Sequence, residues 1–236
     1  MGKCYDTVLF DADGTLLDFS RSEHEALVES LASIGILADE ALIAAYSKIN
    51  DGLWKALERG EIAKEVLKYR RFELLFESYK IECDAKEAAL RYMQSLSQKG
   101  YFLMGAEEMC KHLFGKIRMY IVTNGVGFIQ KERQKRSGLS SYIEASFISE
   151  EIGYEKPDIR YFETVASSIE GFSKEKTLLV GDSLSSDMLG GILFGIDTCW
   201  YNPKGNPMPE DMMGKITYVK DNFEAIESLI LQGEEQ

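Results

Sequence analysis

Two acidic residues follow a short apolar run near the start of this 236-residue chain. The run spans residues 7–10 (TVLF), and the acids are Asp11 and Asp13, with Gly14 directly behind them. An apolar run bounded by turn residues predicts a buried strand, and a glycine lets the chain turn sharply at its end. Ligands of open α/β sheets bind at the carboxyl ends of the strands, so this strand would deliver two carboxylates to a crevice. Because neighbouring carboxylates repel each other, the pair favours a bound cation.

The spacing of these acids has two plainer interpretations. An Asx-rich turn would place the same residues in a loop without further chemistry. A calcium-binding loop would need Gly at the position of Leu16 and Glu at the position of Ser22, so the calcium interpretation fails. An Asx-rich turn would explain the sharp turn, but it would not explain the three further polar fragments that occur later in the chain.

The overall composition restricts the classes of partner. The chain is 45% hydrophobic and 28% charged, as in ordinary globular proteins, and it is long enough for one large domain or a core with an inserted subdomain. Its formal net charge of −12 argues against a nucleic acid polymer or an anionic membrane, because both attract Lys and Arg. A small anionic substrate held by a metal and a few local cations remains compatible with this charge.

Cysteine spacing and hydropathy together predict a cytoplasmic location. The four cysteines form no C-x-x-C pair, and only His24 and His112 could join them, so we expect reduced thiols rather than a zinc site or disulfides. No apolar run approaches the roughly 18 residues of a membrane span. Asp6 and Asp11 bracket an apolar stretch that is too short for a signal peptide. We therefore expect no membrane partner.

Residues 19–99 carry apolar side chains at helical intervals and show no strand signal. Ser22 and Asp84 each begin a capping box, which predicts the start of a helix at each position. This segment separates the first strand from all the later ones. We therefore predict a helical cap subdomain at 19–99, standing over the carboxyl end of the first strand, and a catalytic core made of 1–18 and 100–236.

Apolar runs alternate with helical patterns from about residue 101 onward. Their alternation and the near-continuous apolar character of the runs predict an α/β fold with a doubly wound, Rossmann-like parallel sheet. The strands expected after the first are 119–122, 143–148, 177–180, 198–201 and, at an edge, 216–219.

Three further polar fragments lie at the ends of predicted strands or just beyond them. An open sheet would gather them with the first two acids at one edge. Together they supply a carboxylate nucleophile, a proton carrier, phosphate donors and metal ligands. The fragments are Thr123-Asn124, Lys156-Pro157, and Gly181-Asp182 with Asp187.

The order of these fragments resembles that of the haloacid dehalogenase superfamily, and within it the phosphatases with an aspartate nucleophile. The motifs D-x-D-G-T-L, T-N-G, E-K-P-D and G-D-S-x-x-S-D occur in the family's order between Asp6 and about Tyr201. The acid at Asp13 is informative, since dehalogenases of this superfamily lack an acid there and the transport ATPases carry Thr. The resemblance therefore implies phosphatase or phosphomutase chemistry on a Rossmann-like core with a cap.

The resemblance implies a role for each acid. Asp11 would attack phosphorus and form an aspartyl-phosphate, a nucleophilic role open to carboxylates. Asp13 would protonate the leaving oxygen and later accept a proton from the hydrolytic water. Mg²⁺, which prefers hard oxygen ligands, would be bound by Asp11, the backbone carbonyl of Asp13 and Asp182. Asp187 would steady the waters of the metal, or Lys156, from behind these ligands.

The resemblance also implies a phosphate site. Thr123, Asn124 and Lys156 would bind the substrate phosphate, and Thr123 and Lys156 would contribute to catalysis. Backbone N–H groups at the start of a helix are a natural anion site. Taken alone, Thr123 also fits a helix cap, Lys156 a solvated surface charge and Asp182 a turn residue.

The stretch 181–203 resembles the bacterial pyrimidine 5′-nucleotidase branch of the superfamily. We therefore expect a nucleoside 5′-monophosphatase that prefers pyrimidines and acts, as a monomer or homodimer, on a small phosphorylated substrate. One alternative is a sugar-phosphate phosphatase or phosphomutase with the same core and cap. Two others are a non-enzymatic phospho-aspartate acceptor and a catalytically silent binder.

The predicted cap would exclude water and select the leaving group. Phe19, Trp54 and Lys55 are the candidates for contact with that group, although core packing is the commoner task of large aromatic side chains. Arg21, Arg70 and Arg71 are expected to be surface charges rather than substrate ligands.

Overall fold

A computed structural model describes residues 4–232 of the chain. The chain divides into two compact units, the first formed by the chain up to Phe19 and from Tyr101 onward, the second by Ser20–Gly100. Both ends of the predicted core lie outside the described residues. The assignment of the two units as catalytic core and cap stays a prediction.

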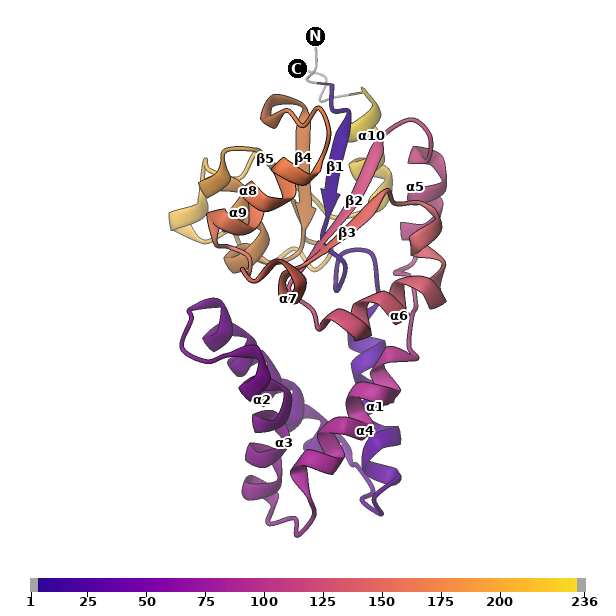
Figure 1. The fold of residues 1–236 in the computed structure, drawn as a ribbon, viewed down its shortest axis with the longest axis vertical. Helices are drawn as coiled ribbons and strands as arrows, with labels where there is room; N and C mark the ends of the chain where they lie inside the picture. The colour runs from indigo at the N-terminus through magenta and orange to yellow at the C-terminus, as the bar shows by residue number, and fades with distance from the viewer. Residues whose placement is uncertain (1–3, 233–236) are drawn as a thin grey trace. The chain divides into compact units, whose positions relative to one another are not determined.

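Six parallel strands form the centre of the first unit: β1 (Thr7–Phe10), β2 (Arg118–Thr123), β3 (Ala145–Ile148), β4 (Thr177–Gly181), β5 (Asp197–Tyr201) and β6 (Tyr218–Lys220). Their order is β3-β2-β1-β4-β5-β6, so the chain moves outward from β1 in one direction and later in the other (Figure 1). The order reverses between β1 and β4, which is where open α/β sheets bind ligands. The predicted doubly wound parallel sheet is confirmed.

Helices cover both faces of this sheet. Figure 1 shows α8 (Ile159–Ser168) and α9 (Leu189–Phe194) on one face, with α5 (Ala106–Leu113) and α10 (Phe223–Gln232) on the other. Two further helices follow strands β2 and β3 along the chain. These are α6 (Gly127–Ser137) and α7 (Ser149–Ile152).

The central strand is buried on both sides because its side chains alternate between the two faces. Val8 and Phe10 pack with α5 and α10, whereas Leu9 packs with α8 and α9. All three side chains are fully buried. This two-sided burial explains why the strand is a continuous apolar run rather than an alternating one.

The second unit is helical, as its periodicity predicts. Its helices are α1 (Phe19–Ala32), α2 (Glu40–Glu58), α3 (Lys64–Tyr79) and α4 (Ala85–Ser97). The rings of Tyr46, Phe72 and Tyr92 meet in its interior with centroids 5.2–5.5 Å apart. No helix within residues 4–232 combines the length and apolar character needed to cross a membrane.

The two predicted helix starts have different outcomes. Asp84 caps α4, where its carboxylate accepts hydrogen bonds from the backbone N–H groups of Lys86 and Glu87, so this prediction is confirmed. The start at Ser22 is wrong, because α1 already begins at Phe19. Hydrogen bonds within residues 12–17 close a tight turn after β1, which lets the helix begin three residues earlier. Ser22 is buried instead, and its hydroxyl donates to the Lys99 carbonyl.

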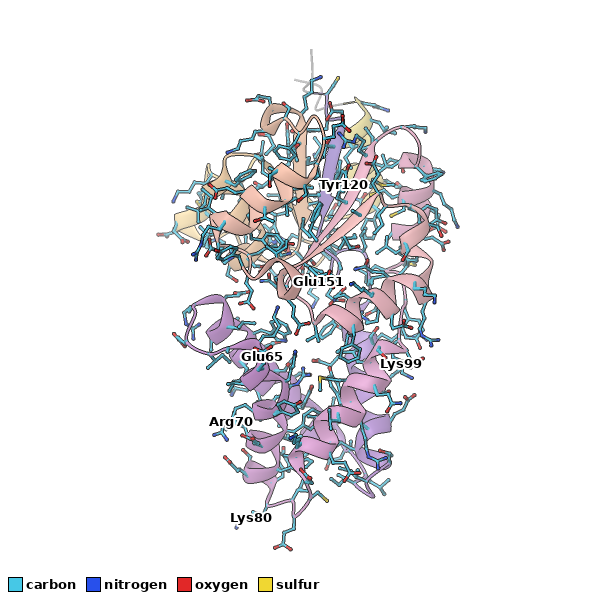
Figure 2. All side chains as sticks on the ribbon, in the orientation of Figure 1. Glu65, Arg70, Lys80, Lys99, Tyr120 and Glu151 are labelled. Carbon is cyan, nitrogen blue, oxygen red and sulfur yellow. The ribbon has the colours of Figure 1, made fainter. Side chains whose placement is uncertain are left out.

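Arg70 and Arg71 lie in different environments. Arg70 points away from the helices and pairs with Glu73 and Glu77, as expected of a surface charge (Figure 2). Arg71 is buried, so its predicted surface position is wrong. Its Nη1 donates to the Asn50 side chain, and its guanidinium lies 4.6 Å from the centre of the Tyr92 ring. Polar and aromatic partners inside the unit stabilise this cation away from water.

Candidate active site

Three carboxylates meet where the order of the sheet reverses. Asp11 directly follows β1, and Asp182 directly follows β4 beside it. Asp187 lies on the π-helical turn Leu184–Met188, which leads into α9. One oxygen of each carboxylate lies within 4.8 Å of the others. The structure thus brings together the predicted metal ligands Asp11 and Asp182 with Asp187.

Two glycines allow this close approach. Gly14 has a φ of +84°, and a Cβ atom built on it would lie 2.5 Å from the Asp182 carboxylate. A Cβ atom on Gly181 would lie 2.4 Å from the Asp187 carboxylate. Distances this short exclude any side chain unless the carboxylates move. The close approach of the carboxylates therefore explains why glycine occupies these positions in the D-x-D-G and G-D-S fragments.

Lys156 holds two of these carboxylates together. Its ammonium donates to Asp11 Oδ1 at 2.7 Å, to Asp187 Oδ1 at 2.6 Å and to the Val122 carbonyl at 2.8 Å. These three bonds use the three protons of the ammonium. The side chain is 1% exposed, so the interpretation of Lys156 as a solvated surface charge is wrong.

Asn124 positions the Lys156 backbone. Its side-chain oxygen accepts from the Lys156 N–H at 2.8 Å, and its amide group donates to the Lys156 carbonyl at 2.9 Å. The two bonds hold the N–H and the C=O of Lys156. This residue precedes Pro157, and the peptide bond between them is cis. The side chain of Asn124 is thus committed to Lys156, and contact with a phosphate would fall to its backbone N–H.

Thr123 lies at the end of β2 and is 2% exposed. Its hydroxyl oxygen accepts a hydrogen bond from the Gly125 N–H at 3.0 Å. A hydroxyl that accepts in this way can still donate its own proton, as a phosphate oxygen requires. Helix α6 begins four residues further on, at Gly127.

The electrostatics of the cluster favour a divalent cation. Burial raises the pKa of Asp11 well above its usual value, with Lys156 opposing the shift and Asp187 and Asp182 reinforcing it. Burial would lower the pKa of Lys156, but the charges of Asp11 and Asp187 outweigh it and raise the pKa. Three ionised carboxylates beside one ammonium leave two negative charges uncompensated. Mg²⁺ carries the opposite charge and prefers such oxygen donors, so the residues fit this ion.

Asp182 also lies among more negative than positive charges. The residue as a whole reaches solvent, yet its carboxyl group lies among protein atoms beside Gly14 and Thr15. Burial of this carboxyl group, reinforced by the charge of Asp187, raises its pKa to about 7. The Trp200 indole N–H donates to the Asp182 carbonyl at 2.9 Å and fixes the backbone at this point.

Asp13 lies close by in sequence but faces other partners. Its carboxylate accepts hydrogen bonds from Gln130 and Arg133, both on α6. Neither residue is predicted from the sequence, because the many polar residues of the α6 segment are typical of a surface helix. Their spacing of three residues, together with Gln134, does mark one face of that helix. That polar face is buried.

The predicted contacts of the helical segment with a leaving group stay predictions. Phe19 lies in the first unit, with its ring centre 5.6 Å from the Arg133 guanidinium. Trp54 is half-buried and Lys55 is exposed on α2.

Residues 5–195 match the family model for haloacid dehalogenase-like hydrolases. The chain belongs to this family. Among curated proteins, it is 42% identical over 200 residues to the pyrimidine 5′-nucleotidase PynA of Streptococcus pneumoniae, with 84% of each chain covered. It is 29% identical over 226 residues to the pyrimidine 5′-nucleotidase YjjG of Escherichia coli, covering 96% of this chain and 98% of that one.

A solved structure of this hydrolase family has a very similar fold. The putative HAD-hydrolase YfnB of Bacillus subtilis, in a crystal structure bound to magnesium, matches with a TM-score of 0.91 and 36% identity. The match covers 97% of this chain and 99% of that one. The resemblance of the motifs to the superfamily is thereby confirmed.

Proposed function

We propose that this hydrolase is a Mg²⁺-dependent phosphomonoesterase that acts through an aspartyl-phosphate at Asp11 and prefers pyrimidine nucleoside 5′-monophosphates. We infer the reaction class from the cluster that lies where the strand order reverses, which consists of Asp11, Asp182, Asp187 and Lys156. The substrate class rests on the pyrimidine 5′-nucleotidases PynA and YjjG, which align with most of this chain.

The nucleophile in this proposal is the Asp11 carboxylate. Lys156 fixes one of its oxygens at 2.7 Å, which limits rotation of the side chain. A phosphate monoester dianion repels carboxylates, so positive charge must surround the phosphate before attack. Lys156 supplies one such charge from within the protein, and a divalent cation would neutralise the remaining acids.

The phosphate site would consist of hydroxyl and N–H donors. Thr123 presents a hydroxyl at the end of β2, and the backbone N–H groups from Asn124 onward lead into the start of α6. Such donors bind phosphate oxygens without adding a second negative charge to the site. Lys156, which is bonded to Asp11, would add its positive charge to this site.

Asp13 would act as proton carrier. As the P–O bond to the nucleoside breaks, the Asp13 carboxyl would give its proton to the leaving oxygen, and its carboxylate would later accept a proton from the attacking water. Its side chain is 24% exposed, compared with 10% for Asp11, which suits a group that exchanges protons with the substrate and water.

Mg²⁺ would be held by Asp11, Asp182 and the Asp13 backbone carbonyl, with Asp187 beside them. When bound, the ion would withdraw charge from the phosphate oxygens and from the carboxylates around them. A cytoplasmic location, and a monomeric or homodimeric state, stay predictions.

The test is phosphate release from a panel of nucleoside 5′-monophosphates and sugar phosphates, with Mg²⁺ and with EDTA. We expect the highest kcat/KM for pyrimidine nucleotides and no activity in EDTA. A flat profile or a preference for sugar phosphates would reject the nucleotide assignment. Phosphate found on a second oxygen of the substrate would instead indicate a phosphomutase, and a stable phospho-protein without phosphate release would indicate an acceptor.

A further inference from the structure

The Asp13 carboxylate is held at both oxygens by helix α6. The Gln130 amide group donates to Oδ2 at 2.5 Å, and the Arg133 guanidinium donates to Oδ1. Gln130 is 1% exposed and Arg133 is fully buried. A carboxylate fixed at both oxygens cannot rotate about its last side-chain bond, so its orientation toward a substrate is set before the substrate arrives.

The orientation of the Gln130 amide is itself fixed by a chain of hydrogen bonds. Ser146 on β3 donates to the Gln134 side-chain oxygen at 2.5 Å, and the Gln134 amide group donates to the Gln130 oxygen at 3.4 Å. With its oxygen engaged in this way, Gln130 presents its NH₂ group to Asp13. If the amide were flipped, its oxygen would face a carboxylate oxygen. Two acceptors with no proton between them repel each other, so this orientation is disfavoured.

The burial of these polar side chains requires an explanation beyond packing. The buried face of α6 carries Gln130, Arg133 and Gln134, where apolar residues would release more water at lower electrostatic cost. Arg133 is paired with Asp13, and its guanidinium lies 5.6 Å from the centre of the Phe19 ring. This buried cation compensates the charge of the second acid of the D-x-D motif.

We propose that Gln130 and Arg133 are positioning residues, which hold the Asp13 carboxyl group in the orientation needed for proton transfer to the leaving oxygen. The inference rests on the proposed function, because it assigns a task to the proton carrier of that reaction. Neither residue touches the reacting phosphate. Both act through Asp13.

The dependence of the reaction on the leaving group separates this role from a structural one. A nucleoside 5′-oxygen is a poor leaving group and requires a proton, whereas p-nitrophenolate leaves as a stable anion and does not. Loss of a correctly placed acid therefore slows phosphoryl transfer to Asp11 from the nucleotide much more than transfer from p-nitrophenyl phosphate. This first step determines kcat/KM, whereas hydrolysis of the aspartyl-phosphate is common to both substrates. A smaller folded fraction would lower both rates by the same factor.

The variants are Gln130→Met, Arg133→Lys and Arg133→Met, with Arg136→Gln on the exposed face of α6 as the matched control. We expect Gln130→Met to lower kcat/KM for the nucleotide about tenfold or more, with a small change in kcat/KM for p-nitrophenyl phosphate. Arg133→Lys should retain more nucleotide turnover than Arg133→Met, and Arg136→Gln should match the wild type. Gln130→Met keeps the ion pair between Arg133 and Asp13, so it still tests the inference if the Arg133 variants do not fold.

A second measurement asks whether the effect passes through Asp13. In an Asp13→Asn background, assayed with the nucleotide, addition of Gln130→Met should cause no further loss of kcat/KM. Equal losses of kcat/KM on both substrates, or an additive loss in the Asp13→Asn background, would each overturn the inference. Asp11→Asn is the separate control for the proposed function, since it should abolish turnover of both substrates whatever the state of α6.

Discussion

Lys156 is a buried cation between two carboxylates, and we propose both a structural and a chemical role for it. Its ammonium bonds to Asp11 and Asp187 at 2.7 and 2.6 Å within a site that excludes most water. Removal of one partner from a buried ion pair is strongly destabilising, because the remaining charges lose their compensation. In the proposed reaction the same charge would also offset the negative charge of the substrate phosphate.

We expect Lys156→Met to lower the free energy of unfolding by about 3–5 kcal/mol and nucleotide turnover by about a hundredfold or more. Urea denaturation in EDTA measures the first effect, and phosphate release measures the second. Lys131→Met serves as the control, since Lys131 pairs with Glu151 but remains 61% exposed. Wild-type stability in Lys156→Met would show that the three acids do not need this cation.

Glu23 gives the helical unit a pH-dependent stability. Its carboxylate accepts hydrogen bonds from Asn50 at 2.8 Å and from Ser47 at 3.1 Å. Burial raises its pKa from 4.5 to about 7, against the opposing effects of Ser47, Arg71 and Asn50. Between these two pH values the folded protein binds more protons than the unfolded chain, so Glu23 makes the protein less stable as the pH rises from about 4.5 to about 7.

We therefore expect Glu23→Gln to remove this part of the pH dependence. The free energy of unfolding of the variant, minus that of the wild type, should rise by on the order of 2–3 kcal/mol between pH 4.5 and pH 7.5. Denaturant titrations at several pH values measure this difference. A difference that stays constant over the range, or falls, would contradict the raised pKa.

The ends of β1 and β4 determine where the acids lie, and glycine determines how close they come. Gly181 ends β4, and its missing side chain leaves room for the Asp187 carboxylate. Its backbone does not adopt a positive φ, so an alanine there would act through contact alone. Gly52 on α2 also lacks a positive φ and has nothing within 4 Å of a built Cβ atom.

We expect Gly181→Ala to weaken Mg²⁺ binding about tenfold or more, because the displaced Asp187 no longer supports the acids beside it. Gly52→Ala should leave Mg²⁺ binding unchanged. Isothermal titration calorimetry compares the two variants directly. Equal affinities in both would mean that the position of Asp187 has no effect on the metal.

The individual elements differ in how well the sequence predicts them. The strands at 7–10 and 177–181 are buried on both faces, so their continuous apolar runs identify them clearly. Strand β3 begins at Ala145, two residues later than expected, because only its last residue is fully buried and its pattern is weak. Helix α1 begins at Phe19 rather than near Ser22, since a tight turn closed by hydrogen bonds within residues 12–17 precedes it.

Long-range contacts explain what the sequence could not predict about the site. Asp11, Lys156 and Asp182 follow from the family's motifs, and a parallel sheet gathers their strand ends at one edge. Gln130 and Arg133 carry no such motif, and hydrophobicity assigns their helix to the surface. Their burial depends on an acid more than a hundred residues earlier in the chain, which no local pattern encodes.

The family match over residues 5–195 and the fold shared with YfnB extend over most of the molecule. The proposed reaction depends on one bond, which forms between an Asp11 carboxylate oxygen and the substrate phosphorus. The intermediate should accumulate in Asp13→Asn with p-nitrophenyl phosphate, because the first step then needs no acid while the attacking water lacks its base.

The most direct test is an acid quench of that reaction, followed by mass spectrometry of the peptides. We predict a burst of p-nitrophenol equal to the enzyme concentration, with one phosphoryl group on the peptide that contains Asp11 and its position at that residue. A phosphoryl group on another residue, a burst without any labelled peptide, or undiminished hydrolysis by Asp11→Asn in excess Mg²⁺ would contradict the claim.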